Sequence, residues 1–355
     1  MTTNGGIVIV GGGLAAARTA EQLRKAEYAG PITLISDEVH LPYDRPPLSK
    51  DVLRAEVDDT TLKPAEFYDE NNITLLLGSG AAELDTEAQT VTLTNGEVVA
   101  YEELVIATGL VPRTIPTLPN LAGIRVLRTY DESMALREHA GSLASVLGTE
   151  IGELVARLHR AEGVDVRCGV GVTGVTGTGH VEKVQLADGS ELDADVVVVG
   201  IGSRPSTDWL EGSGIAVDNG VVCDIAGRTS APNVWAIGDV ASWRDAAGHQ
   251  VRVEHWSNVA EQARVIVPAM LGRDATAAVV VPYFWSDQYD VKIQCLGEPK
   301  AGDTVHIIED DGRKFLAFYE RDGAVSGVVG GGMPGKVMKN RAKVAAAVPI
   351  ADVLG

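Results

Sequence analysis

A glycine-rich turn near the start of the chain is the first segment whose residue types and spacing could do chemistry. Gly11, Gly13 and Ala16 occupy the fixed positions of the pattern G-x-G-x-x-G/A. The first glycine permits a tight turn, the second lets backbone N–H groups approach a pyrophosphate, and a small third residue lets helix and strand pack closely. Asp37 follows the next apolar run, where a carboxylate can accept hydrogen bonds from a ribose diol.

These residues need a strand, a turn, a helix and a second strand to position them. Residues 7–10 (IVIV) predict a strand buried on both faces, as in a parallel sheet, and residues 17–28 carry helix formers at helical spacing. Residues 32–35 (ITLI) predict the second strand. Because this order is that of a dinucleotide-binding βαβ unit, we expect a dinucleotide site; a purely structural glycine turn is the alternative.

Composition limits the possible classes of protein. The 355 residues predict two or three domains, and 45% hydrophobic with 22% charged residues indicates a soluble globular chain without a membrane span. The start has no secretory pattern, so we expect a cytoplasmic protein. A net charge of −19 repels phosphate backbones, so no nucleic-acid partner is expected. Cys168, Cys223 and Cys295 are too far apart in sequence for a disulfide framework or a metal cluster, so no metal site is expected.

Five further segments carry a resemblance to a known family. They are PYDRPPLSK at 42–50, ATG at 107–109, AIGD at 236–239, VEHWSNVAEQA at 253–263 and FWSDQYDVKIQ at 284–294. With the glycine turn, the set resembles the FAD-dependent NAD(P)H:ferredoxin, rubredoxin and putidaredoxin reductases, flavoproteins of the glutathione-reductase fold. The resemblance covers nearly the whole chain.

The resemblance implies an α/β architecture of three domains. A Rossmann-like FAD-binding domain would comprise residues 1–112 and 226–281. An inserted, truncated NAD(P)H-binding domain would comprise residues 113–225, and an α+β C-terminal interface domain residues 282–355.

The resemblance also implies which residues form the FAD shell. Lys50 would place a cation near the flavin edge and Trp285 would lie near the flavin on the ferredoxin side, so these two are the catalytic candidates. A solvated surface charge and a core tryptophan are the respective alternatives. The cofactor-binding candidates are Gly11, Gly13, Leu14, Ala15, Asp37, Arg45, Lys50, Ala82, Ala107, Thr108, Gly109, Arg128, Gly238, Asp239, His255 and Trp256.

The cysteines and the basic residues bear on the electron path. Because no cysteine precedes Cys168, we expect no dithiol or sulfenic acid chemistry at the flavin, but direct transfer of a hydride in and electrons out. The expected acceptor is an iron–sulfur ferredoxin, which is commonly acidic. A basic run offers a candidate docking surface, with a solvated helix face as the alternative. It consists of Lys336, Lys339, Arg341 and Lys343.

The second nucleotide-binding domain lacks its expected first half. After Arg128 the resemblance implies a strand, a glycine turn and a helix, but residues 129–141 lead directly into a predicted amphipathic helix at 142–163. A βαβ unit of roughly 30 or more residues therefore has no counterpart between about Ala140 and Leu143. Gly169, Gly171 and Gly174 also spell G-x-G-x-x-G, but strand residues follow them, so we expect no phosphate site there.

Three functions remain open at this point. The first is an FAD oxidoreductase of the ferredoxin-reductase type with impaired NAD(P)H binding. The second is an FAD-binding fragment or engineered scaffold without NAD(P)H-dependent turnover. The third is a relative that reduces a small quinone or an ascorbyl radical. The gap would expose a parallel-sheet edge, so the chain could be a monomer or a dimer.

Overall fold

The computed structural model describes residues 5–137, 149–245, 248–274, 281–300 and 302–354. The chain forms two compact units. Unit 1 comprises Met1–Thr114, Val126–Glu138 and Val199–Ala278, and unit 2 comprises Ile115–Arg125, His139–Val198 and Val279–Gly355. Unit 1 thus resumes at residue 199, ahead of the predicted boundary at 226. The reason is that β14 (Ser203–Pro205) pairs antiparallel with β8 (Leu110–Pro112).

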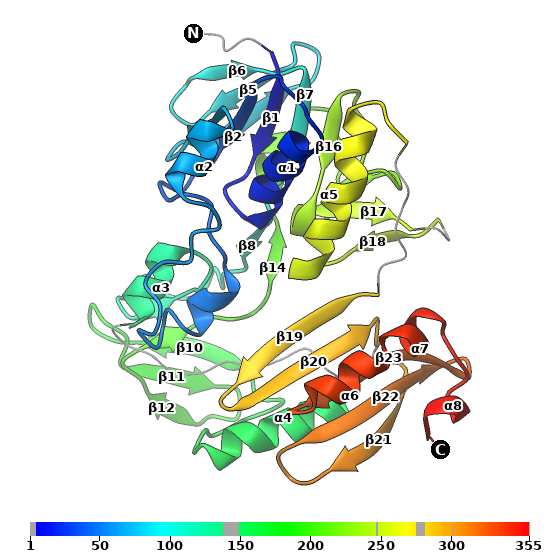
Figure 1. The fold of residues 1–355 in the computed structure, drawn as a ribbon. Coiled ribbons are helices and arrows are strands. Elements are labelled where there is room, and N and C mark those ends of the chain that lie inside the picture. Colours follow the sequence, from blue (N-terminus) through cyan, green and yellow to red (C-terminus); the bar gives the residue numbers. More distant parts are fainter. Residues whose placement is uncertain (1–4, 138–148, 246–247, 275–280, 301, 355) are drawn as a thin grey trace. The chain divides into compact units, whose positions relative to one another are not determined.

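Unit 1 is built on a five-stranded parallel sheet with the order β16-β7-β1-β2-β3 (Figure 1). All residues of β1 and β2 are buried, which confirms the prediction of strands covered on both faces. The strands are β1 (Ile7–Val10), β2 (Ile32–Ile35), β3 (Ile73–Leu76), β7 (Glu103–Ile106) and β16 (Val234–Ala236).

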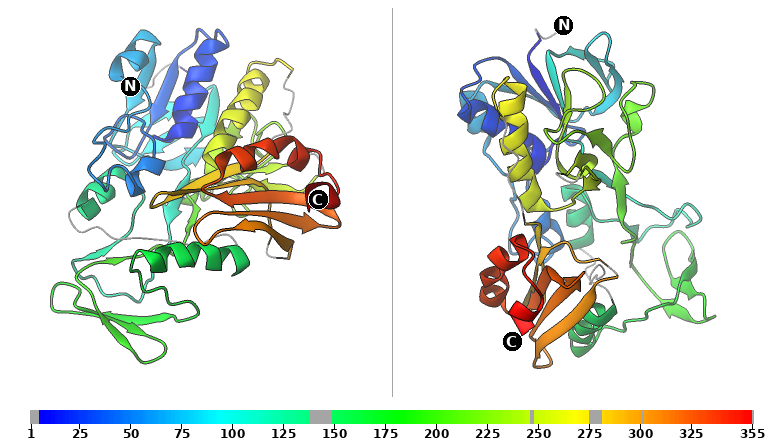
Figure 2. Two further views of the ribbon diagram at one scale, coloured as in Figure 1. Left: turned by 60° about the horizontal axis from the view of Figure 1, so that its bottom comes forward. Right: turned by 90° about the vertical axis from the view of Figure 1, so that its right-hand side faces the viewer.

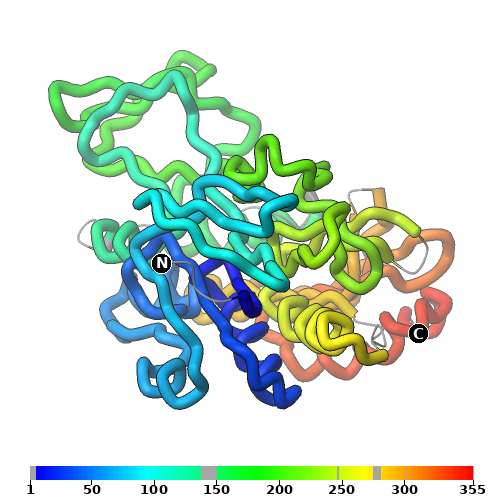
Figure 3. The backbone as a smooth tube through the Cα atoms, turned by 90° about the horizontal axis from the view of Figure 1, so that it is seen from above, coloured from blue at the N-terminus to red at the C-terminus, as the bar shows by residue number. Residues whose placement is uncertain are grey.

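The two faces of this sheet carry different layers. Helices α1 (Leu14–Lys25) and α5 (Trp256–Met270) lie side by side on one face, where their apolar residues form one core with β1 and β2 (Figure 3). Helix α1 begins three residues earlier than predicted, directly after Gly13. The other face packs against the antiparallel sheet of β4 (Ala81–Asp85), β5 (Thr90–Leu93) and β6 (Val98–Ala100). Within the described ranges both faces of the sheet are therefore covered, and the strand ends remain for a ligand to approach.

Arg24 fixes the far end of α1. Its guanidinium donates hydrogen bonds of 2.6–2.9 Å to the backbone carbonyls of Tyr28, Gly30, Asn71 and Asn72. These carbonyls belong to the segments that lead into β2 and β3. The contacts hold α1 along the sheet, so that its N-terminus stays at the strand ends.

Unit 1 contains further short elements. They are η1 (Pro46–Ser49), α2 (Ala65–Glu70), α3 (Tyr130–Arg137), η2 (Asp208–Leu210), β15 (Val221–Cys223), η3 (Gly238–Val240), β17 (Ala241–Arg244) and β18 (Gln250–Arg252).

Unit 2 is built on a five-stranded antiparallel sheet with the order β19-β20-β23-β22-β21. Asp322 and Gly323 form the turn between the last two strands of this sheet, and both residues have positive φ, as a two-residue hairpin turn requires. The strands are β19 (Tyr283–Gln288), β20 (Val291–Gly297), β21 (Thr304–Asp310), β22 (Phe315–Arg321) and β23 (Ala324–Gly331).

Helices cover both faces of this sheet (Figure 2). On one face lie α6 (Pro334–Lys339), α7 (Arg341–Ala345) and α8 (Ala351–Leu354). On the other face lies α4 (Thr149–Ala161), which buries Ile151 and Leu158 against the sheet. The resemblance placed this helix in the second nucleotide-binding domain, whereas its apolar stripe packs on the C-terminal sheet. Residues 142–148 of the predicted helix lie outside the described residues.

The rest of the expected second nucleotide-binding domain is small. Strands β9 (Ile124–Arg125) and β13 (Val197–Val198) form a two-stranded parallel pair, and β10 (Val172–Thr176), β11 (Lys183–Leu186) and β12 (Glu191–Asp193) form an antiparallel sheet. Of the second glycine pattern, only Gly174 lies in a strand, β10, whereas Gly169 is in a turn and Gly171 just precedes β10. The pattern is thus followed by a strand, as expected, but it is not a strand throughout. The predicted join between 140 and 143 lies outside the described residues. No helix in the described ranges is long and apolar enough to cross a bilayer.

Glu21 gives a prediction about stability. Burial alone would raise the pKa of this α1 carboxyl, but hydrogen bonds from Lys25, Arg18 and Lys63 lower it to about 2. The carboxylate therefore stabilises the fold above its unfolded pKa of 4.5, and this stabilisation is lost as the pH falls towards 2. Glu21→Gln should lower the free energy of unfolding by about 2 kcal/mol at pH 7. Urea unfolding between pH 7 and pH 3 should show the gap to wild type narrowing only below about pH 4.5; a gap independent of pH would contradict this account.

Candidate functional site

A cavity of about 520 Å³ lies in unit 1 at the carboxyl ends of the parallel strands. This is the edge at which open α/β sheets bind ligands. Most of the predicted cofactor-binding residues line it. They are Gly11, Gly13, Leu14, Ala15, Asp37, Arg45, Ala107, Thr108, Gly109, Arg128, Gly238, Asp239 and Trp256.

Four predicted site residues do not line the cavity. Ala82 is exposed, and the preceding residue Ala81 lines the cavity in its place. Lys50 ends the short helix η1, and His255 immediately precedes α5. Trp285 belongs to unit 2, where its ring stacks on that of Tyr283 at 5.8 Å between centroids. The catalytic roles of Lys50 and Trp285 therefore remain predictions.

The backbone of the glycine turn lies so close to neighbouring residues that it leaves no room for side chains. Gly11 has a φ of 143°, and a Cβ added there would lie 2.2 Å from the carbonyl oxygen of Ala107. A Cβ on Gly12 would lie 2.1 Å from Oγ of Ser36. The turn therefore packs directly against the ends of β7 and β2, and α1 begins at Leu14, which lines the cavity. The unpaired N–H groups of this helix N-terminus favour a phosphate.

The two acidic residues after β2 have different roles. Both oxygens of Glu38 are engaged within the protein: Oε1 accepts from Nη2 of Arg45 and Oε2 accepts from the hydroxyl of Tyr43, each at 2.6 Å. Asp37 lines the cavity, and its carboxylate has no such pairing with any residue that the structure describes. Asp37 is therefore the carboxylate placed to meet a ribose, as predicted from its position after β2.

Two arginines line the cavity, and they differ in whether a carboxylate pairs directly with the guanidinium. Arg45 pairs with Glu38, and its Nε lies 4.0 Å from the position a Cβ would take on Gly13. Arg128 lies beside Gly109, and its Nε is buried without a hydrogen-bond partner among the described residues. Burial, and then the nearby charge of Arg45, lower the pKa of Arg128. The charges of Asp239 and Glu254 offset this effect in part. A buried N–H without an acceptor is costly, and an anionic ligand could supply the acceptor.

The remaining polar groups close the site. Burial raises the pKa of Asp239, and the charge of Arg128 partly offsets this effect. Asp44 accepts a 2.8 Å hydrogen bond from the indole Nε1 of Trp256, which joins the loop after β2 to the start of α5. Thr108 donates a 2.8 Å bond to the carbonyl of Ser206.

Sequence reasoning missed several residues that line the cavity. Tyr43 and Asp44 lie inside the segment 42–50 that was already singled out, so they could have been included. Ser206 and Trp209 lie in a segment assigned to another domain, and no local pattern marked them. Within the described ranges, no cluster of His, Cys, Asp or Glu side chains could hold a metal ion.

These residues fit FAD, as tested by the geometry alone. The glycine turn excludes side chains where a pyrophosphate must approach, and Asp37 is available for the adenosine ribose. Arg128 has a buried Nε without an acceptor among the described residues, and Asp239 can accept from a ribityl hydroxyl.

Comparison with known proteins agrees with this geometry. The model of the pyridine nucleotide-disulphide oxidoreductase family matches residues 5–146 and 136–263, and that of the reductase C-terminal domain matches residues 283–353. The chain belongs to the pyridine nucleotide-disulphide oxidoreductase family. The α/β fold class with a separate C-terminal domain is thereby confirmed.

Three members of the family illustrate the similarity. The ferredoxin–NAD(+) reductase subunit of the benzene 1,2-dioxygenase system of Pseudomonas putida is 33% identical, over 82% of this chain and 80% of the relative. The 5,5′-dehydrodivanillate O-demethylase ferredoxin reductase subunit of Sphingobium sp. (strain NBRC 103272 / SYK-6) is 36% identical, over 90% of this chain and 88% of the relative. A chain in the crystal structure of the covalent putidaredoxin reductase–putidaredoxin complex matches with a TM-score of 0.93 and 28% identity, over 100% of this chain and 96% of that chain. The present chain is accordingly an oxidoreductase of the ferredoxin-reductase type, in a family that uses FAD with NAD(P)H as electron donor.

The difference in pairing between Arg45 and Arg128 gives a testable prediction. Arg128→Met should weaken FAD binding about tenfold or more, because a charge-assisted contact is lost. The same change should alter the stability of the apoprotein by less than about 1 kcal/mol, because it removes the unsatisfied Nε but also takes a favourable charge away from Asp239. Flavin fluorescence titration of the apoprotein and its thermal unfolding would measure both effects.

Arg45→Met serves as the matched control. It should lower the free energy of unfolding of the apoprotein by about 1–2 kcal/mol, because Glu38 would lose its cationic partner. If both variants destabilised the apoprotein equally, the distinction between the two arginines would be wrong.

Proposed function

We propose that this chain binds FAD in the cavity of unit 1 and passes electrons to an acidic iron–sulfur ferredoxin, with NAD(P)H binding weakened in this chain. The observation that carries the proposal is the cavity itself. It combines a glycine turn with no room for side chains, a carboxylate after β2, and Arg128, whose buried Nε has no hydrogen-bond partner among the described residues.

Each residue of the cavity has a physical task in this proposal. FAD would accept the two electrons of a hydride and release them one at a time. The N-terminus of α1 and Arg45 would hold its pyrophosphate, and Asp37 would hold its adenosine ribose. The bond between Asp44 and Trp256 would keep the loop after β2 and the start of α5 together at the cavity wall.

Two observations support weakened binding of NAD(P)H. The family model matches in two blocks that overlap at residues 136–146, where the predicted join lies. The described segments 115–125 and 149–198 contain no strand, glycine turn and helix in the order that a second pyrophosphate site requires. Without such a turn, a nicotinamide dinucleotide loses most of its charge-assisted contacts.

The competing function is a flavin-binding protein without NAD(P)H-dependent turnover. The same two observations favour it, because a chain with an intact FAD cavity and no donor site would hold the cofactor without cycling. The choice between the two depends on whether NAD(P)H reduces the bound flavin at all.

An anaerobic titration separates these functions. The purified protein should bind FAD, and stepwise addition of NADH or NADPH at micromolar concentrations should leave its visible absorbance unchanged, whereas dithionite should bleach it fully. Slow bleaching only at millimolar NADH would favour a weakened reductase, and none at any concentration would favour the flavin-binding protein. Rapid bleaching at micromolar NADH would show that the weakening of donor binding is wrong.

The basic run at α6 and α7 supports the ferredoxin partner. All four cations are exposed in a protein of net charge −19. Lys336 pairs with Glu309, and Lys343 donates to the carbonyl of Asp352. Lys339 and Arg341 pair with no carboxylate in the described part of the chain, so they are available for an acidic partner.

Reversal of two charges tests this surface. Lys339→Glu with Arg341→Glu should weaken binding to an acidic [2Fe–2S] ferredoxin about tenfold at low salt and flatten its salt dependence. Arg244→Glu with Arg264→Glu changes the net charge equally at two exposed cations of unit 1 and should have a much smaller effect. Equal effects of the two double variants, measured by titration calorimetry, would remove the surface from the proposal.

A further inference from the structure

Tyr43 lies in a small core between two segments distant in sequence. Its side chain is buried, at 4% exposure, and packs with Leu48 and Val52 against Tyr130 and Met134 of α3. The first three residues belong to the segment after β2, and the last two follow Arg128. This core therefore joins the two segments that supply Arg45 and Arg128.

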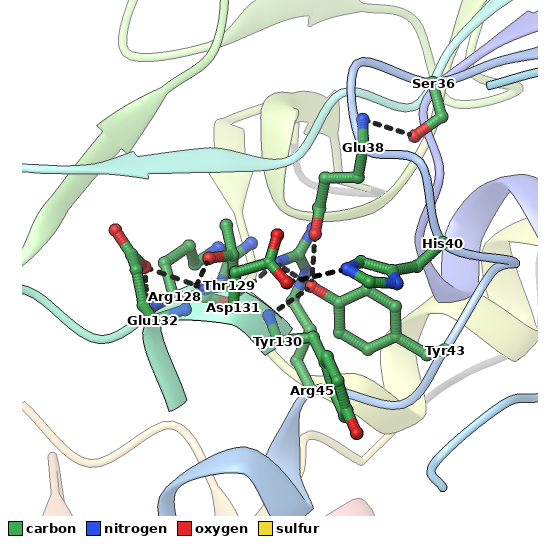
Figure 4. A network of polar contacts seen from close by, with 10 residues as sticks. All are labelled: Ser36, Glu38, His40, Tyr43, Arg45, Arg128, Thr129, Tyr130, Asp131 and Glu132. Atoms are coloured by element: carbon green, nitrogen blue, oxygen red, sulfur yellow. Dashed lines mark hydrogen bonds and ion pairs between the residues drawn. The ribbon is translucent and has the colours of Figure 1, made fainter. Parts of the chain in front are cut away.

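The hydroxyl of Tyr43 makes three hydrogen bonds within the protein (Figure 4). It donates to Oε2 of Glu38 at 2.6 Å, and it accepts from Nη1 of Arg45 at 3.1 Å and from the backbone N–H of Tyr130 at 3.0 Å. A phenol has one proton to donate and two lone pairs. The three bonds use the proton and both lone pairs. The ring of Tyr43 borders the cavity, while its hydroxyl bonds to neighbouring residues.

These bonds place the two arginines together. Glu38 holds Arg45 by its second oxygen, and Nη1 of Arg45 also donates to the backbone carbonyl of Arg128 at 2.7 Å. The backbone of the Arg128 segment is further fixed by Glu132, whose Oε2 accepts from the N–H groups of Arg128 and Thr129. The Tyr43 hydroxyl thus contacts the carboxylate, the guanidinium and the following backbone of this network.

The protonation of the phenol suits this arrangement. Burial raises the pKa of Tyr43, the charge of Arg45 lowers it, and the bond to Glu38 raises it again, with a net increase. The phenol therefore keeps its proton at neutral pH and remains a donor to Glu38.

We propose that Tyr43 is a positioning residue of the cofactor site: its hydroxyl sets Arg45 against the glycine turn and holds the Arg128 segment in register with it. This rests on the proposed function for the identity of the cofactor as FAD. Tyr43 acts through the two arginines, so its effect falls on the phosphate-bearing part of a ligand.

The test compares ligands with and without a pyrophosphate. Tyr43→Phe keeps the ring and its packing but removes the hydroxyl, which leaves Oε2 of Glu38 without its donor. FAD and ADP should bind the apoprotein about tenfold more weakly, whereas adenosine, which has no phosphate, should bind within twofold of wild type. A merely structural loosening would weaken ADP and adenosine by the same factor, so the ratio of the two affinities is the deciding readout.

Tyr130→Phe is the matched control. Tyr130 belongs to the same small core, but its hydroxyl donates to the carbonyl of Asp58 and not to Glu38 or Arg45. This variant should keep the wild-type ratio of ADP to adenosine affinity. Thermal unfolding of both apoproteins would show that each variant is folded.

A Tyr43→Phe protein with the wild-type ratio would overturn the proposal, as would an equal change of the ratio in Tyr130→Phe. Failure of the proposed function is a separate result. The wild-type chain would then bind ADP but not FAD, and the ratio of ADP to adenosine affinity would still decide the role of Tyr43.

Discussion

The site of unit 1 depends on the close approach of one backbone turn to two strand ends. Any side chain at Gly11 would collide with the carbonyl of Ala107, and any at Gly12 with Ser36. Because the turn is pressed against β7 and β2 in this way, α1 begins at the cavity, and its other end is fixed by Arg24. The remaining cavity residues are placed by the same parallel sheet.

The charged residues that line the cavity distinguish it from an ordinary cleft. The protein carries a net charge of −19, yet two arginines meet at the ligand edge of unit 1. Arg45 pairs directly with Glu38, whereas Arg128 feels the charges of Asp239 and Glu254 but has no acceptor for its Nε among the described residues. A cofactor with a pyrophosphate would stabilise the fold when bound, since it could supply that acceptor.

Short sequence patterns predicted the features that adjacent residues form, whereas contacts between distant segments could be found only in the structure. The glycine turn and the two buried strands follow from a few adjacent residues, and each was confirmed. The amphipathic pattern of α4 shows that its apolar face must pack against another element. The sheet against which it packs lies more than a hundred residues later in the chain. The role of Tyr43 depends on Tyr130, 87 residues away, and the contact of Ser206 with Thr108 spans 98 residues. No spacing rule encodes such contacts.

The path of the chain has a consequence for folding during synthesis. The chain crosses between the two units five times, so neither unit is a contiguous stretch that could emerge and fold first. Helix α4 leaves the ribosome well before β23, the central strand that its sheet requires. Its apolar stripe must stay uncovered for that interval, at a translation rate of about 5–20 residues per second. Nascent chains of this protein should thus be clients for chaperones that bind exposed amphipathic helices until the last strand is made.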